Sequence, residues 1–178
     1  KEPNAYLKDR FKDLIFKFKG SEKIEKNYSQ SFQDLFVLMA LNGKREGNWL
    51  EIGCAHPTYG NNTYLLESEF GWNGISIDLS QESISQWVDR KATAICADAL
   101  KVNYNDFPEI TDYLQIDVDP PEISYEVLLR IPFWSHKFRV ITFEHDYYAD
   151  DSQTIRDKSR KYLKSFGYEL VVSNIAPD

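Results

Sequence analysis

The chain has 178 residues, a length that suits one domain able to bury about 70% of its unfolded surface without a disulfide or a metal. Aromatic residues make up 15% of it, which argues against disorder. The net charge is −7, and because residues 1–26 carry +3, the rest carries −10. An acidic body is a poor partner for a nucleic-acid backbone, and no run of 18 apolar residues predicts a membrane span, so we expect neither partner.

Two helices are predicted near the start of the chain. Residues 4–19 repeat apolar side chains at three- and four-residue steps and place lysines on the other face, which predicts an amphipathic helix. Such a basic helix can lie on a membrane, but packing across a domain edge is more usual, and we expect that role. A second helix is expected over residues 32–41, ended by Asn42-Gly43. Its buried stripe should consist of Phe32, Leu35, Phe36, Met39 and Ala40.

From residue 46 onward, short apolar runs alternate with helical segments. Strands separated by helices are typical of parallel strands joined by crossovers, so we predict an α/β fold with a doubly wound, mostly parallel sheet. The chain would then be one domain over 1–178, with N-terminal helices over 1–45 and an α/β core over 46–178. Strands are expected at 49–52, 74–77, 92–96, 113–118, 139–143 and 168–173, and helices at about 61–70, 81–89, 122–130 and 152–165.

The two cysteines are predicted to stay reduced. Cys54 follows the first strand and Cys96 ends the third. In the usual strand order 3-2-1-4-5 these strands are not neighbours, and two strand spacings of about 9–10 Å are too far for a disulfide. Reduced cysteines and the lack of a visible signal peptide lead us to expect a cytoplasmic protein.

Acidic and small residues stand where the predicted strands end. In an open α/β sheet, ligands bind at the carboxyl ends of the strands, at the point where the strand order reverses. These strand-end residues are therefore the predicted binding site. They are Glu51, Gly53 and Ala55 after the first strand, Asp78 and Leu79 after the second, Asp98 and Ala99 after the third, and Asp117 and Asp119 after the fourth.

Each of these residues suits a task in binding an adenosine group. Gly53 would let the backbone pass close to a ligand without a Cβ clash. Asp78 could accept hydrogen bonds from both ribose hydroxyls, and Asp98 could read an adenine amino group. Glu51 could order the turn or meet a cationic part of the ligand. The alternative is that the acids only cap the helices that follow, as Asp78 before Ser80 could do.

The glycine pattern favours a ligand without phosphates. The fingerprint G-x-G-x-x-G of dinucleotide sites is absent, because Gly53 is followed by Ala55 and Pro57. A pyrophosphate needs a glycine-rich turn and a free helix N-terminus, whereas S-adenosylmethionine has no phosphate. The sequence therefore favours S-adenosylmethionine over NAD, with further contacts from the same loop. These contacts are expected from Tyr59, Asn62 and Thr63, and His56 is a candidate to line the methyl site.

Ionisable residues also gather at the ends of the fourth and fifth strands. Asp117 and Asp119 follow one strand, and Glu144, His145 and Asp146 follow the other. Methyl transfer to a hydroxyl needs a base, so His145, Glu144 and Asp119 are the predicted catalytic residues. The same cluster could hold a divalent metal, an alternative that we do not favour. Glu144 and His145 could instead only satisfy the loop backbone.

The chain resembles the FkbM-type methyltransferase family over about residues 29–175. Six segments carry the resemblance. They are Ser31–Phe36, Glu51–Gly53, Asn62–Glu67, Phe70–Gly74, Leu114–Asp119 and Gly167-Tyr168.

The resemblance implies a Rossmann-like class I methyltransferase fold that uses S-adenosylmethionine to methylate a hydroxyl of a small molecule, sugar or glycan. That topology has a last antiparallel strand, and only about five residues follow the sixth predicted strand, so we expect it to be missing. Two departures from the family pattern border the acceptor side. The chain has His56-Pro57 where members carry an acid and a glycine, and Asp119-Pro120 where many carry Glu-Gly.

Three other functions remain as alternatives. Asp119-Pro120-Pro121 resembles the Asp-Pro-Pro-Tyr motif of adenine amino methyltransferases, but Glu122 replaces the aromatic residue that stacks on the base. A non-catalytic domain of the same fold would tolerate changes at Asp119, Glu144 and His145. An NAD-dependent oxidoreductase is the third. His136, in a predicted loop, is expected at the surface or partly packed.

Overall fold

The structure is a computed structural model that describes residues 17–145 and 153–172. The predicted helix over 4–19 falls almost wholly outside these residues, and so does Asp146. Residues 17 and 18, which are described, are not helical.

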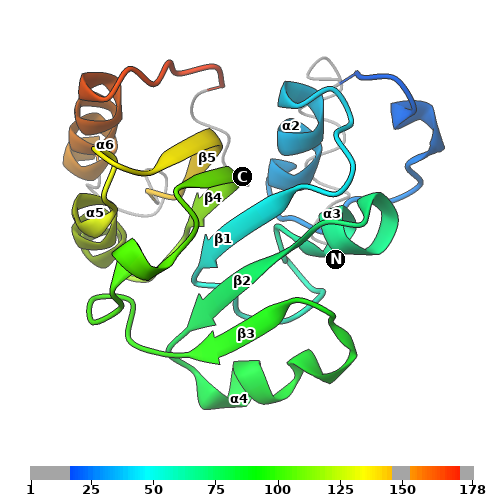
Figure 1. Cartoon of the computed structure of the whole chain (residues 1–178), viewed down its shortest axis with the longest axis horizontal. Coiled ribbons are helices and arrows are strands. Elements are labelled where there is room, and N and C mark those ends of the chain that lie inside the picture. The colour runs from blue at the N-terminus through cyan, green and yellow to red at the C-terminus, as the bar shows by residue number, and fades with distance from the viewer. Residues whose placement is uncertain (1–16, 146–152, 173–178) are drawn as a thin grey trace.

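Five parallel strands form one sheet in the order β3-β2-β1-β4-β5 (Figure 1). This order confirms the predicted α/β fold, and it reverses between β1 and β4, which makes their carboxyl ends the switch point. The first five predicted strands form, and their ends lie within three residues of the predicted ones. They are β1 (Asn48–Ile52), β2 (Asn73–Asp78), β3 (Thr93–Cys96), β4 (Ile110–Ile116) and β5 (Lys137–Phe143).

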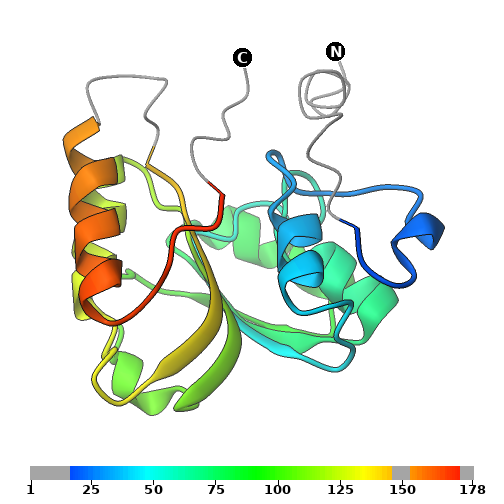
Figure 2. The same ribbon diagram turned by 90° about the horizontal axis from the view of Figure 1, so that it is seen from above.

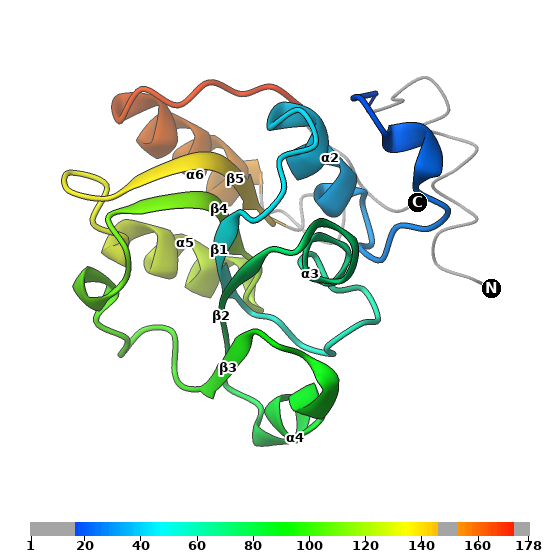
Figure 3. The ribbon, with the colours of Figure 1, turned by 45° about the vertical axis from the view of Figure 1, so that its right-hand side comes forward.

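Helices cover both faces of the sheet. Figure 2 shows α5 and α6 on one face and α2 and α3 on the other, and Figure 3 shows α4 beside the edge strand β3. The α-helices are α2 (Gln33–Ala40), α3 (Tyr64–Phe70), α4 (Gln81–Ser85), α5 (Pro121–Arg130) and α6 (Gln153–Ser165). Three short 3₁₀ helices are η1 (Ser21–Lys23), η2 (Trp87–Asp89) and η3 (Tyr104–Asp106).

Alternating strand residues build two separate cores. On the face of α5 and α6, Leu50 and Ile52 of β1 pack with Leu114 of β4 and with Phe133. On the face of α2 and α3, Trp49 of β1 packs with residues of both helices. This division follows from the pleat, which points successive side chains to opposite faces of a sheet. Glu51 therefore lies on the same face as Trp49, beneath α3.

The predicted buried stripe of α2 is only partly correct, because Leu35, Phe36 and Met39 pack against the core but are not its most buried residues. Val37 and Leu38 are the fully buried apolar residues of this helix, whereas Ala40 is exposed. Asp34 is also fully buried, and it accepts hydrogen bonds from the amides of Tyr28 and Ser29 and from the Ser29 hydroxyl. Burial raises the pKa of Asp34. The loop before the helix thus supplies the hydrogen-bond partners that allow a polar residue to share the buried face of α2. Of the remaining predicted stripe residues, Phe32, Leu35, Phe36 and Met39 are half-buried.

The predicted sixth strand does not form over its described residues. Residues 168–172 make no strand pairing, and Leu170 and Val171 are exposed. A strand needs a partner that accepts its backbone hydrogen bonds, and only the Tyr168 hydroxyl reaches β5, where it accepts from the Phe138 amide at 3.1 Å. The apolar pattern of this segment was therefore misleading.

Three further expectations have clear outcomes. Cys54 and Cys96 are free, as predicted, because β2 lies between β1 and β3. His136 is buried rather than at the surface, and its Nε2 lies 3.0 Å from the carbonyl of Phe107. Within the described part of the chain, no helix is both long and apolar enough to cross a bilayer.

Candidate functional site

The loop of residues 53–63, between β1 and α3, begins with a turn that only glycine can make. Gly53 has φ +80°, and a Cβ atom there would lie 1.6 Å from the carbonyl oxygen of Asp117. The amide of Gly53 donates to the Ile77 carbonyl at 2.8 Å. The close approach expected at Gly53 is therefore to the end of β4, within the protein itself. We call residues 53–63 the β1–α3 loop.

Ala55 is held from two sides although its φ of +46° is unusual for a residue with a side chain. Its amide donates to Asp78 Oδ2 at 2.8 Å, and its carbonyl accepts from Trp87 Nε1 at 3.2 Å. Ala55 and Asp78, which were both predicted to belong to the binding site, thus lie side by side at neighbouring strand ends. The strained conformation persists because both of its backbone groups have partners.

The acids at the ends of β2 and β3 hold the turns that follow them. Asp78 Oδ1 accepts from the Ser80 amide, and Asp98 Oδ1 accepts from the Leu100 amide. The N-cap of α4 is Ser80, so Asp78 is not the helix cap that the alternative required. The Leu100 amide and then the Lys101 side chain lower the pKa of Asp98. Each carboxylate oxygen has a second lone pair, so these bonds leave acceptor capacity for a ligand.

Two small or apolar predicted residues adjoin these acids. Leu79 is 73% exposed, so its side chain is open to a ligand at this edge. Ala99 is buried, and its carbonyl accepts a hydrogen bond from the Tyr104 hydroxyl at 2.8 Å. The amide of Ala97 donates to the Asp78 carbonyl, so the ends of β2 and β3 lie side by side.

Glu51 lies buried beneath the β1–α3 loop. Its Oε2 accepts from the hydroxyls of Ser76 at 2.6 Å and Thr63 at 2.9 Å, and its Oε1 accepts from Asn61 Nδ2 at 3.4 Å. Burial raises the pKa of Glu51 to about 7, against the lowering effects of the Ser76 hydrogen bond and the charge of Arg90. Of the two predicted roles of Glu51, the structure supports the ordering of the turn.

Asn62 presents an acceptor without a partner. Its residue is only 5% exposed, and no described group donates to its Oδ1 atom. A buried acceptor of this kind costs free energy unless a donor reaches it. Its neighbour Thr63 is fully buried and points its hydroxyl to Glu51, which places it beneath the site.

His56 shapes the β1–α3 loop. Its Nδ1 accepts from the amides of Thr58 at 3.1 Å and Tyr59 at 3.0 Å, so this nitrogen is the unprotonated one. The rings of His56 and Tyr59 also meet edge to face. The hydrogen bonds explain a local structural use of the residue that the sequence did not suggest.

The predicted catalytic residues lie at the ends of β4 and β5. The amide of Asp117 donates to the Ile52 carbonyl at 2.9 Å, and the amide of Glu144 donates to the Ile116 carbonyl at 3.0 Å. The backbone therefore brings Asp117 beside Gly53 and Glu144 beside Asp117. Asp117, Glu144 and His145 are half-buried, and Asp119 is exposed. Among the described residues, no group of three or more His, Cys, Asp or Glu side chains is arranged to hold a metal ion.

Three residues that the sequence did not single out hold the site together. Arg90, Trp87 and Asn61 all bond to the β1–α3 loop or lie in it. Asn61 Oδ1 accepts from the amides of Thr63 and Tyr64, which starts α3 at Tyr64 rather than at the predicted residue 61. A weak signal existed for Arg90, a lone arginine just before a predicted strand.

No family model and no curated protein matches this sequence. Solved structures do match it. A candidate rRNA methylase from Clostridium thermocellum aligns with a TM-score of 0.53 and 16% identity, over 82% of this chain and 86% of that one. A TehB-like S-adenosylmethionine-dependent methyltransferase from Corynebacterium glutamicum aligns at 0.46 and 14%, over 88% and 83%. A sugar N-methyltransferase from Streptoalloteichus aligns at 0.43 and 14%, over 78% and 56%.

The clostridial structure and this chain share an architecture. The alignment covers most of both chains, and the part aligned here is built on the five-stranded parallel sheet. The chain therefore has a Rossmann-like α/β fold of the kind found in class I methyltransferases.

Proposed function

We propose that this chain is an S-adenosylmethionine-dependent methyltransferase that methylates a hydroxyl of a small molecule, sugar or glycan. The observation that carries the proposal is the edge of the sheet at β1, β2 and β3. There a glycine turn and two carboxylates lie at neighbouring strand ends, and the loop that follows the turn carries the buried, unpartnered Oδ1 of Asn62. The two carboxylates and the Asn62 Oδ1 atom are hydrogen-bond acceptors, and the exposed side chain of Leu79 is apolar.

The residues fit this cofactor by their chemistry. Ribose hydroxyls, an adenine amino group and an ammonium group are all donors, and Asp78, Asp98 and Asn62 supply acceptors. We expect Gly53 and Ala55 to line the site with their backbone, and Leu79 and Ala99 to border the base. Glu51 and Thr63 lie beneath and support the turn. Asp117 adjoins Gly53.

The acceptor hydroxyl is proposed to lie at the ends of β4 and β5. When bound, S-adenosylmethionine supplies an electrophilic methyl group on a sulfonium sulfur. The chain's own task is to orient the hydroxyl and to receive its proton, for which His145, Glu144 and Asp119 are the proposed groups. The resemblance to FkbM-type methyltransferases supports oxygen as the methylated atom, and a cytoplasmic location belongs to the same proposal.

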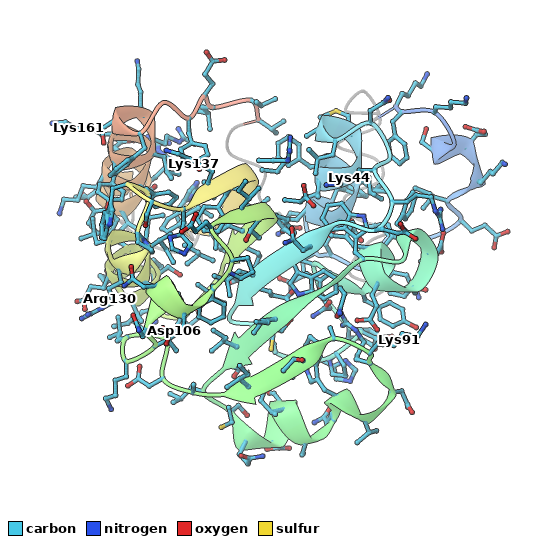
Figure 4. All side chains as sticks on the ribbon, viewed as in Figure 1. Lys44, Lys91, Asp106, Arg130, Lys137 and Lys161 are labelled. Carbon is cyan, nitrogen blue, oxygen red and sulfur yellow. The ribbon has the colours of Figure 1, made fainter. Side chains whose placement is uncertain are left out.

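Asp78→Asn tests the cofactor site directly. Calorimetry should show that wild-type chain binds S-adenosylhomocysteine, the demethylated product, and that the variant binds it about ten- to a hundredfold more weakly. The reason is the loss of a charged acceptor, worth about 1.5–3 kcal/mol. Asp106→Asn is the matched control, because Asp106 lies in η3 on another part of the surface (Figure 4).

Three outcomes would contradict the proposal or its placement of the site. Wild-type chain that shows no binding at millimolar S-adenosylhomocysteine would overturn it. Saturable binding of reduced nicotinamide cofactor, followed by its fluorescence, would favour the oxidoreductase instead. Equal losses in Asp78→Asn and Asp106→Asn would show that the binding site is not at the end of β2.

A further inference from the structure

Arg90 is a buried cation beside the β1–α3 loop. Its side chain is 2% exposed, and its Nε lies 2.9 Å from Oε2 of Glu67, in α3. A buried arginine is tolerated only when a countercharge and hydrogen bonds replace its hydration. Glu67 supplies the countercharge. The other N–H groups of the guanidinium are therefore left to bond to further partners.

The remaining donors of Arg90 point at the β1–α3 loop. Nη1 donates to the carbonyl of Pro57 and to Asn61 Oδ1, and Nη2 donates to Thr63 Oγ1 at 3.0 Å. Thr63 in turn donates to Glu51 at 2.9 Å. Arg90 thus bonds directly to the middle and the end of the loop and to Glu67 of α3. It reaches Glu51 of β1 through Thr63. Asn62 lies between two of these attachment points.

The same segment also reaches the start of the loop. The guanidinium carbon of Arg90 lies 4.3 Å from the centre of the Trp87 ring, and Trp87 Nε1 donates to the carbonyl of Ala55. A cation over an aromatic face is attracted to it, so Arg90 also stabilises the ring that holds Ala55. Figure 4 shows Lys91, the next residue, between α3 and the start of β3, so the backbone here lies outside the strand-end site.

We propose that Arg90 is a positioning residue, which fixes the β1–α3 loop in the conformation that presents Asn62 and Ala55 to the cofactor while not touching the cofactor itself. This inference rests on the proposed function. A planar guanidinium is needed, because Nε, Nη1 and Nη2 serve four acceptors in different directions, and a lysine ammonium presents its donors from a single atom.

The test is Arg90→Lys in the full chain, which keeps the charge and loses the fork. Hydrogen exchange should be at least tenfold faster at the amides of Ala55, Thr63 and Tyr64, and unchanged in the β4 strand. The Ala55 amide bonds to Asp78 of β2, and the Thr63 and Tyr64 amides bond to Asn61 within the loop, so all three hydrogen bonds depend on the conformation of the loop. Calorimetry should show that affinity for S-adenosylhomocysteine falls tenfold or more.

Asp112→Asn is the control for a general loss of stability. Asp112 is also a buried acid. Its carboxylate accepts hydrogen bonds from Lys44 Nζ at 2.6 Å and from the Asn48 amide, and it lies 3.1 Å from Arg139 Nε. These partners are all outside the β1–α3 loop, and Figure 4 shows Lys44 in the segment before β1. This variant should lower the denaturation midpoint and leave loop exchange and affinity as in wild type.

The outcomes separate the two proposals. Unchanged exchange of the loop amides in Arg90→Lys would overturn the positioning role, as would an equal loss of affinity in Asp112→Asn at a matched midpoint. Wild-type chain that fails to bind S-adenosylhomocysteine would overturn the proposed function and the binding part of this inference. In that case the exchange data still decide whether Arg90 fixes the loop.

Discussion

Individual residues stabilise this site through buried hydrogen bonds. Glu51 is the clearest case, because three side chains, two from the β1–α3 loop and one from β2, donate to it. Burial is the main cause of its raised pKa of about 7, and the negative charge of Asp117 adds to the increase. A carboxyl group in this position changes its charge near neutral pH, and stability should report the change.

Glu51→Gln should flatten the dependence of stability on pH. The folded pKa of about 7 lies above the ordinary 4.5, so the folded state binds the proton more tightly. The resulting stabilisation is complete below about pH 4.5 and is lost as the pH rises through 7. At about 1.4 kcal/mol per unit, the wild-type free energy of unfolding should lose up to about 3 kcal/mol more than the variant's.

Urea unfolding at a series of pH values between about 4 and 8 measures this difference. The two chains should converge in acid, where Glu51 is neutral in both states, and diverge toward alkaline pH. Parallel curves over the whole range would show that Glu51 does not titrate in the folded state near neutrality.

At the scale of elements, the β1–α3 loop is stabilised by its neighbours more than by its own sequence. The loop makes hydrogen bonds with Asp78 of β2, Trp87 of η2 and Arg90. The Asp117 carbonyl after β4 leaves no room for a side chain at Gly53. Gly53 is where the loop leaves β1, and it combines a positive φ with a crowded Cβ position. These two restrictions can be separated by mutation.

Gly53→Ala should destabilise the chain by about 3 kcal/mol or more, because the new Cβ would overlap the Asp117 carbonyl and β4 would have to move. Gly20→Ala is the matched control. Gly20 also has a positive φ, of 97°, but nothing lies within 4 Å of a Cβ there, so only backbone strain of about 1–2 kcal/mol is expected. Chemical denaturation gives both values, and equal losses would refute the clash.

For the whole molecule, the sheet separates two apolar cores that meet only through its strands. Phe133 is the centre of one core, with ring centroids of Phe138, Phe166 and Tyr168 at 5.3–5.7 Å. Trp49 and Trp72 belong to the other core. Because β1 and β4 contribute side chains to both cores, we expect the two to unfold together.

Phe133→Ala should lower the free energy of unfolding by about 3–5 kcal/mol through the cavity that it leaves. Tryptophan fluorescence, which reports mainly the opposite core, should shift its midpoint as far as circular dichroism does. Trp134→Ala is the control, because this neighbouring side chain is 68% exposed and should cost less than about 0.5 kcal/mol. Separate transitions for the two probes would show that the cores unfold independently.

The amino-acid pattern alone was enough to predict the parallel sheet and the acids at its carboxyl edge, whereas the strand order was taken from the arrangement usual for such sheets. Those features follow from local periodicity and from the rule that crossovers bring strand ends to one edge, as Asp78 and Asp98 illustrate. The same local reasoning failed where an apolar run had no partner, as at residues 168–172, and where a polar residue lies on the buried face of a helix, as at Asp34.

Only the tertiary structure decided what supports the site. Glu51 accepts from residues 10 to 25 positions away, Arg90 bonds to residues 23 to 33 positions away, and Gly53 is restricted by Asp117. No periodicity encodes such pairings, because they depend on how α3 and the segment before β3 fold over the end of β1. The strand ends are where we propose that the cofactor binds, and these long-range contacts hold the β1–α3 loop beside them.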